Sequence, residues 1–223
     1  MPFITLILYA WFDVEVSLDG TLKDVFMLAF FTSVGFQSDL KVIKQGGKLL
    51  VIMLTLLVGI IALQNLMPMG ITKLMGVDPL IGMAAGSISM TGGHGTAGGF
   101  AGVLEGMGLH GAGTIGMAAA TFGLIAGSMI GGPLAERIIR TKLTHEQMQP
   151  QDEVLGRNYD AAVLCAGMCG FGLGAPPNAM ANMSAVCYKY RYTVKPFLIV
   201  PIIGAMFADF INTGIITLFL NIF

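Results

Sequence analysis

Charged residues are absent from three long stretches of the chain, and each stretch is wide enough to cross a lipid bilayer. Residues 49–72 contain no Asp, Glu, Lys or Arg and have a strongly apolar centre. Residues 106–135 contain none either, and Asp209 is the only one within 196–223. Because a helix needs about 20 apolar residues to cross the hydrocarbon core, we expect transmembrane helices in all three places.

Two further stretches, about 78–104 and 160–188, carry an Asp at their first residue and no other Asp, Glu, Lys or Arg. The first contains the run TGGHGTAGG at 91–99, and the second contains GFGLGAPPN at 170–178. Gly and Pro interrupt helices, and backbone groups that are freed at membrane depth must face protein or a water-filled cavity. The pattern favours two re-entrant hairpins over two flexible Gly-rich spans.

The remaining segments set the boundaries of two halves. Residues 1–12 are uncharged but too few to span a bilayer, and 25–38 predict a short or broken span. A clearly polar linker occupies 136–158. Few contacts should cross such a linker, so we expect an N-terminal half, 1–135, with the first hairpin, and a C-terminal half, 159–223, with the second hairpin and the last span.

Basic residues cluster beside the expected spans. The clusters are Lys41, Lys44 and Lys48, then Arg137, Arg140 and Lys142, and finally Lys189, Arg191 and Lys195. Basic loops favour the cytoplasmic side, and all three clusters can lie inside if one hairpin is entered from outside and the other from inside. Paired broken helices in inverted repeats are a sequence pointer to a secondary transporter's binding site. We therefore expect an all-α membrane protein with two re-entrant Gly-rich hairpins in an inverted-repeat arrangement.

Composition excludes several other classes of protein. Of the 223 residues, 55% are hydrophobic and only 11% are charged, against about 25% charged residues in ordinary soluble domains. A net charge of -1 does not fit a polybasic nucleic-acid binder. The sequence contains no catalytic triad, paired carboxylates or P-loop, so we expect a protein that is not an enzyme and needs no cofactor.

The two Gly-rich breaks are the expected substrate site. A broken helix presents free N–H groups at the start of one half-helix, which bind carboxylates, and free C=O groups at the end of the other, which bind Na⁺. Glycine lets a ligand approach the backbone closely, and His94 could either bind substrate or orient its loop. The substrate-binding candidates are Gly93, His94, Gly95, Thr96, Gly172, Gly174 and Asn178.

Oxygen-bearing side chains near the breaks and in the last span are candidate Na⁺ ligands, because hard cations prefer oxygen. These candidates are Thr91, Asn182, Asp209 and Asn212. A charge at the bilayer centre costs about 2.5–3.5 kcal/mol on insertion scales, so Asp209 needs a cavity or a partner. Asn212 lies three residues later on the same helical face. The pair could ligate Na⁺, hold an ammonium group or form a hydrogen bond between helices.

Several spaced motifs resemble the bacterial sodium/glutamate symporters. They are SISMTGGHGT at 87–96, ATFGLIAGSMIGGP at 120–133, NYDAAVL at 158–164, CGFGLG at 169–174, AMANM at 179–183 and DFIN at 209–212. The resemblance extends from about Val25 to the C-terminus. It differs in three respects: Pro176 stands where a Thr is usual, 143–157 replaces a central block of several spans, and other members have more spans before this chain's start.

The resemblance implies Na⁺-coupled import of L-glutamate, or of a related anionic amino acid, by alternating access in the bacterial inner membrane. It implies a multi-pass protein surrounded by lipid, with Na⁺ as the coupling ion and a homo-oligomer as a possible assembly. Two alternatives stay open at this point. The chain could be a truncated core that binds without completing a transport cycle, or a passive ion or solute channel, since paired re-entrant loops also build pores.

Overall fold

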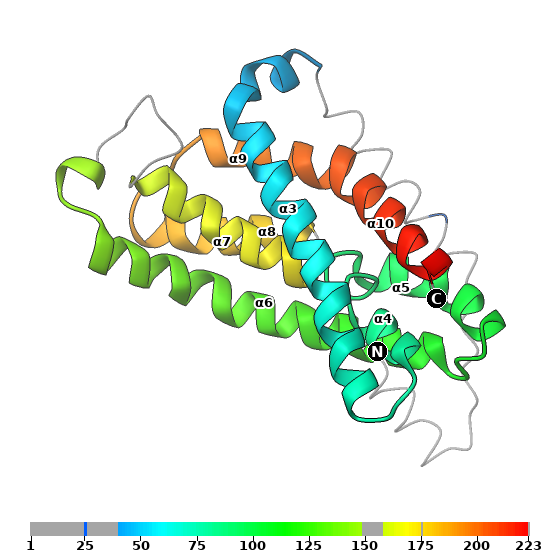
Figure 1. Ribbon diagram of the computed structural model, residues 1–223. Helices are drawn as coiled ribbons and strands as arrows, with labels where there is room; N and C mark the ends of the chain where they lie inside the picture. Colours follow the sequence, from blue (N-terminus) through cyan, green and yellow to red (C-terminus); the bar gives the residue numbers. More distant parts are fainter. Residues whose placement is uncertain (1–24, 26–39, 149–157, 175, 223) are drawn as a thin grey trace. The chain divides into compact units, whose positions relative to one another are not determined.

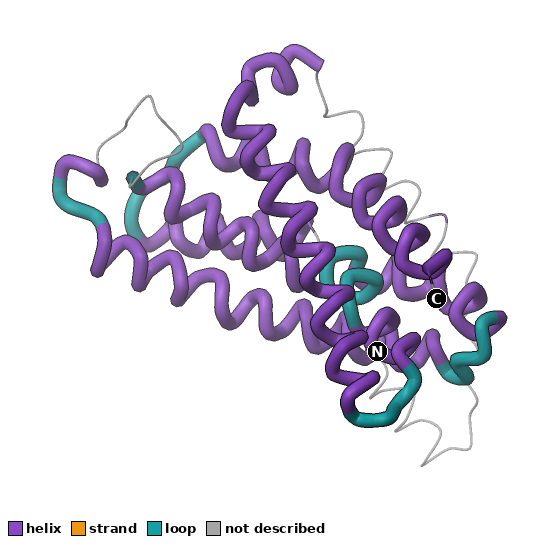
Figure 2. Tube along the Cα trace, viewed as in Figure 1, coloured by secondary structure: helices purple, strands orange, loops and turns teal. Residues whose placement is uncertain are grey.

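The computed structural model describes residues 25, 40–148, 158–174 and 176–222, and these residues contain helices and no strand. The α-helices, labelled in Figure 1, are α3 (Leu40–Leu74), α4 (Pro79–Ala85), α5 (Gly93–Gly106), α6 (Ala112–Lys142), α7 (Tyr159–Gly174), α8 (Pro176–Lys189), α9 (Lys195–Ile202) and α10 (Asp209–Ile222). Two further helical segments are the 3-10 turn η1 (Glu146–Met148) and the π-helix η2 (Ile203–Ala208). Figure 2 distinguishes the helices from the loops between them. The expectation of an all-α protein is thus confirmed for the described residues. Apart from Val25, the expected segments 1–12 and 25–38 lie outside them.

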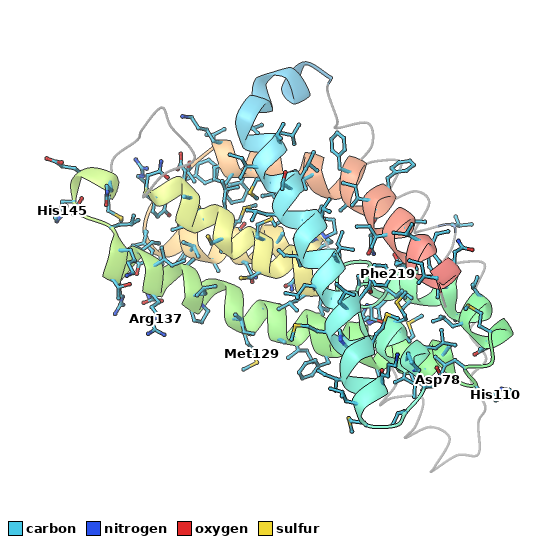
Figure 3. All side chains as sticks on the ribbon, in the orientation of Figure 1. Asp78, His110, Met129, Arg137, His145 and Phe219 are labelled. Carbon is cyan, nitrogen blue, oxygen red and sulfur yellow. The ribbon has the colours of Figure 1, made fainter. Side chains whose placement is uncertain are left out.

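The chain divides into two compact units, Met1–Val34 and Gly35–Phe223, and all of the helices named above belong to the second. Two of them, over Leu50–Leu74 and Ala112–Lys142, are long and apolar enough to cross a membrane. Only 28% of the residues in the most apolar part of each helix are buried inside the protein. On α6, for example, Met129 and Arg137 project away from the neighbouring helices (Figure 3).

The third expected span is helical from Lys195 to Ile222 but is not a uniform α-helix. Its middle, Ile203–Ala208, is π-helical. Pro201 lies two residues before this segment, and proline cannot donate a backbone hydrogen bond and clashes with the preceding turn. A widened turn at this point is a usual way to absorb such an interruption. Asp209 is the first residue of the regular α-helix that follows.

The first Gly-rich run does not break the helices where we expected, and this part of the prediction is wrong, whereas the second break, at residue 175, lies within the expected run 170–178. In the first hairpin the break is the turn 86–92, and most of the expected 91–99 run is helical in α5. In the second hairpin only residue 175 separates α7 from α8. Glycine within a helix costs only about 1 kcal/mol relative to alanine, and close packing offsets this cost: a Cβ on Gly170 would lie 2.7 Å from the backbone of Ala179.

Helices α7 and α8 form an antiparallel hairpin whose open end is closed by hydrogen bonds. The hydroxyl of Thr193 donates to Asp160 Oδ1 at 2.7 Å, and the hydroxyl of Tyr159 donates to the carbonyl of Arg191. The guanidinium of Arg191 also lies over the Tyr159 ring, 5.2 Å from its centroid. These contacts fix the residues that enter and leave the hairpin, so α7 and α8 form one packed element.

Helix α6 packs along this hairpin and along α5 through a stripe of small residues (Figure 1). The buried residues of this stripe are Ala112, Gly116, Ala120, Gly123, Gly127, Gly131 and Ala135. A Cβ on Gly123 would lie 2.5 Å from the carbonyl oxygen of Leu173, and one on Gly131 would overlap the side chain of Asn182. Small residues allow helix backbones to approach closely where no side chain fits between them. The glycines of α6 therefore set its distance from the hairpin.

The apolar core consists of two clusters, and helix α3 takes part in both. The first half of α3, including Leu57 and Ile61, packs with α7, α9 and η2. Its second half, including Met69, packs with α4, α5 and Ile216 of α10. Gln64 and Asn65 lie on α3 between these two sets of apolar residues. A polar layer therefore separates the core around the second hairpin from the core around the first.

Candidate functional site

Gln64 of α3 is hydrogen-bonded to both hairpins at once. Its Nε2 donates to the carbonyl of Gly172 in α7, and its Oε1 accepts a hydrogen bond of 2.7 Å from the hydroxyl of Thr91. Thr91 belongs to the turn between α4 and α5. The structure thus brings Thr91 and Gly172, two of the expected site residues, to the same side chain although they come from different halves of the sequence.

Asn65, the next residue of α3, belongs to a second set of contacts. Its Oδ1 accepts a 3.0 Å hydrogen bond from the backbone N–H of Ser87, and the Ser87 carbonyl accepts a 3.1 Å hydrogen bond from Asn212 Nδ2. The three residues come from α3, the 86–92 turn and α10, and each is at most 1% exposed. The expected ion ligand Asn212 is therefore held against the turn of the first hairpin.

Two buried amides of α8 bind the backbone of α6. Asn178 accepts a 2.6 Å hydrogen bond from Ser128 Oγ and donates to the carbonyl of Leu124 at 3.2 Å. Asn182 donates to the carbonyl of Gly127 at 2.9 Å and to a carbonyl of α7 at 3.3 Å. These bonds are possible because glycine at the facing positions of α6 leaves room for the amides. In this conformation both amides connect the second hairpin to α6.

The candidate residues of the first hairpin lie at the beginning of α5. Gly93 has φ +63°, a left-handed conformation that favours glycine. His94 is exposed, and its Nε2 lies 3.0 Å from the hydroxyl of Thr121 on α6. Gly95 and Thr96 are partly buried in the same first turn. No side chain caps this helix start, and the first N–H groups of an α-helix have no partner within the helix.

Gly172 and Gly174 occupy the last turn of α7, where little space is left for a side chain at Gly174. A Cβ there would lie 2.6 Å from Asn178 Nδ2 and 3.0 Å from the Cα of Leu124. The nearest atom to a Cβ on Gly172 would be 3.6 Å away, which is an ordinary contact. Gly172 thus contributes its carbonyl to the site, whereas Gly174 is required for the packing of Asn178.

The four expected Na⁺ ligands contact different parts of the protein. Thr91 is bonded to α3, Asn182 to α6 and α7, and Asn212 to the 86–92 turn. Asp209 is partly buried at the beginning of α10, three residues before Asn212. Asp209 and Asn212 therefore share a helical face as expected, and the assignment of these four residues to Na⁺ stays a prediction.

Inspection of the sequence missed Gln64 and Asn65, as well as Ser128. All three lie within stretches that were identified by their lack of charge, and counting charges does not reveal neutral amides or hydroxyls. Two adjacent amides in the middle of an otherwise apolar helix were the available signal, since polar groups within a span are rare and commonly functional.

A separate cavity of about 370 Å³ lies between the end of α6 and the beginning of α7. It is lined by Ile138, Lys142, Leu143, Asn158, Ala161, Ala162 and Cys165. None of the expected site residues is among them. The polar layer around α3, rather than this cavity, is therefore the candidate functional site.

Comparison with known proteins shows which family this chain resembles in sequence. A protein-family model described as sodium/glutamate symporter matches residues 1–154 and 148–192. The sodium/glutamate symporter of Escherichia coli (strain K12) is 26% identical over 336 residues, which cover 92% of this chain and 84% of that protein. The symporter of Haemophilus influenzae (strain ATCC 51907 / DSM 11121 / KW20 / Rd) is 26% identical over 331 residues, covering 89% and 82%. No solved structure gives a significant match.

Both alignments are longer than the 223 residues of this chain. More than a hundred aligned positions therefore have a residue in the relative and none here. The family model matches in two segments, and these overlap at 148–154, within the polar linker. The linker is also where the sequence led us to expect that a central block of spans is missing.

Proposed function

This chain belongs to the sodium/glutamate symporter family, and we propose that it imports L-glutamate, or a related anionic amino acid, together with Na⁺ by alternating access. Membership of this family makes the chain a membrane transport protein rather than an enzyme. We place it in the bacterial inner membrane as a multi-pass protein, with its polar linker on the cytoplasmic side.

The observation that best supports this proposal is the position of the polar layer within α3. Asn65 follows Leu50 by fifteen residues and precedes Leu74 by nine, so at 1.5 Å per residue it lies about 22 Å and about 14 Å from the ends of this apolar helix. Asn65 therefore lies well away from both ends of a helix that is long enough to cross a hydrocarbon core of about 30 Å. Secondary transporters bind substrate and coupling ion near this depth, at discontinuous helices.

We assign the substrate to the space around Gln64, between the start of α5 and the end of α7. The N–H groups at Gly93–Gly95 suit a carboxylate, because the start of a helix carries partial positive charge. The carbonyl of Gly172, which accepts from Gln64 in this conformation, suits the substrate's ammonium group. His94 and Asn178 are the neighbouring polar side chains, and Thr96 and Gly174 complete the candidate set.

The link through Gln64 also suggests how the site opens. Neutral hydrogen bonds contribute only about 0.5–1.5 kcal/mol each, so breaking both bonds of Gln64 costs about as much as one good substrate contact returns. We propose that the substrate replaces the Gln64 side chain as the hydrogen-bond donor to the Gly172 carbonyl. The two hairpins then move relative to one another. Re-entrant entry from opposite sides of the membrane is part of the same proposal.

A second candidate function is a binding core that does not transport. It is favoured by the more than a hundred aligned positions that the related symporters have and this chain lacks. In this case the substrate and Na⁺ sites remain, while the helices against which they would move are absent.

Uptake of radiolabelled L-glutamate into proteoliposomes that contain the full chain separates these functions. Accumulation that requires an inward Na⁺ gradient, and stops when choline replaces Na⁺, supports the symporter. Binding without uptake supports the non-transporting core, and downhill flux that ignores Na⁺ indicates a channel instead. The variant Gln64→Leu should lower Na⁺-driven uptake at least about tenfold, whereas Leu63→Ala, on the exposed face of the same turn, should retain it.

A further inference from the structure

We propose that one Na⁺ ion binds where α3, the 86–92 turn and α10 meet, with Ser87 Oγ and Asn212 Oδ1 as its protein ligands and Asn65 beside it. The inference rests on the proposed function and specifies where the coupling ion is held. It replaces the dispersed set of four expected ligands by a single buried position. Only Asn212 belongs to both sets.

Three buried polar atoms at this position lack a hydrogen-bond partner: Asn65 Nδ2, Ser87 Oγ and Asn212 Oδ1. An unsatisfied buried polar group costs about 1–3 kcal/mol, so three of them in one place indicate an occupant. All three belong to residues that are directly bonded through Ser87. The three atoms therefore belong to one hydrogen-bonded group of residues rather than to separate parts of the core.

The orientation of these atoms is fixed by their neighbours. Asn65 Oδ1 is held by the backbone N–H of Ser87, and Asn212 Nδ2 is held by the Ser87 carbonyl. Neither amide can be reversed without losing that hydrogen bond. Asn212 therefore presents an oxygen to the site, Ser87 adds a hydroxyl oxygen, and Asn65 presents an N–H group.

The position is too closely packed to admit an amino acid. Asn65, Ser87 and Asn212 are each at most 1% exposed. The neighbouring turn also lies directly on α3, since a Cβ on Gly86 would be 2.6 Å from the carbonyl oxygen of Gln64 and 2.9 Å from Asn65 Oδ1. Glutamate consequently belongs at Gln64, next to this position, rather than in it.

Charge favours a cation over a water molecule alone. Asp209 lies one helical turn from Asn212 on the same face, and residues 49–72, 74–136 and 196–223, which include the site, contain no Lys or Arg. A carboxylate in such surroundings is costly without a counter-charge. Two oxygens do not complete the shell of a hard cation, so the ion keeps water, and Asn65 donates to one of these water molecules.

Na⁺-dependent thermal stability of the purified full chain tests this site without glutamate. Melting temperature is measured against NaCl concentration, with choline chloride keeping the ionic strength constant. A ligand that binds only the folded state stabilises it by about 2.7 kcal/mol at a hundredfold excess over its Kd. We expect a saturable rise with Na⁺ that choline does not produce.

The decisive variant is Ser87→Ala, because it removes one ligand oxygen while the backbone of Ser87 still holds Asn65 and Asn212. The Na⁺ concentration at half-maximal stabilisation should rise at least about tenfold, equivalent to about 1.4 kcal/mol. Ser89→Ala is the matched control: Ser89 is equally buried in the same turn, but its hydroxyl is already bonded to the carbonyl of Ala84. Its Na⁺ midpoint should stay within about twofold of the parent.

The proposal is overturned if the parent shows no Na⁺-specific stabilisation, or if the Ser87→Ala titration overlays that of the parent, which would indicate an ordered water only. Should Ser87→Ala not fold, Ser87→Cys answers the same question, since sulfur is a poor ligand for a hard cation. A parent that binds Na⁺ here but does not accumulate glutamate would overturn the proposed function and leave this site in place.

Discussion

The distance between α6 and the second hairpin depends on Gly131 but not on the adjacent Gly132. Gly131 faces Asn182, and a Cβ at this position would overlap the Asn182 amide, whereas a Cβ on Gly132 would meet nothing within 4 Å. The same substitution to alanine, one residue apart, should therefore destabilise the protein at the first position and leave it intact or slightly more stable at the second.

The magnitude follows from the contacts of Asn182. Overpacking a well-packed core costs about 1–3 kcal/mol, and displacing Asn182 breaks its two hydrogen bonds to backbone carbonyls, worth about 0.5–1.5 kcal/mol each. Alanine returns about 1 kcal/mol through its better helix propensity. We expect a net loss of about 1–5 kcal/mol for Gly131→Ala and a gain of up to about 1 kcal/mol for Gly132→Ala.

Thermal unfolding of the detergent-purified variants measures this difference. For a chain of this size 1 kcal/mol shifts Tm by about 2–4 °C, so the two variants should differ by at least about 2 °C. In the background Asn182→Ala, which removes the overlapping amide, Gly131→Ala should lose most of its effect, because residues in contact are energetically coupled. Equal melting temperatures for the two glycine variants, or an undiminished effect in that background, would refute the packing argument.

Two further predictions concern the ion and the topology. Asp209→Asn keeps the size of the side chain and removes its charge, so the Na⁺ concentration needed for half-maximal glutamate binding should rise, and a Na⁺ titration that overlays the parent would exclude a role for this carboxylate. With the native cysteines replaced, a cysteine at Met75 should react with an impermeant thiol reagent from outside and one at His145 only from the cytoplasm, because basic residues cluster on the latter side; reaction of both from the same side would contradict the inverted arrangement.

The long uncharged stretches predicted helices correctly because their physical requirement is simple. A run of more than 20 residues without charge is visible in the sequence, and α3 and α6 contain the two clearest runs. Their ends were harder to predict, since they depend on local backbone geometry. Helix α6 begins at Ala112, six residues into the uncharged stretch 106–135, after Gly108 and Gly111 adopt φ values of +104° and +77°.

The glycine runs show why the site was only partly predicted. Glycine serves in a turn and in close helix packing for the same reason, namely the lack of a side chain, and a single sequence does not separate these uses. Gly93 has positive φ at the start of α5, whereas Gly170 and Gly174 are helical and packed. The sequence therefore placed the second break within its Gly-rich run but placed the first one too late in the chain.

Gln64 and Asn65 required the structure, because their importance comes from what they contact. Apolar packing is non-directional and roughly proportional to buried area, so the clusters on either side of this layer support the two hairpins without specifying a register between them. Directional hydrogen bonds specify that register, and at the layer they are few and neutral. A small ligand that competes for such bonds can shift the equilibrium between two arrangements by its differential affinity alone. The polar layer between the hairpins is therefore the place where binding of substrate and ion can be converted into movement. The apolar clusters on either side of it can stay intact during this movement.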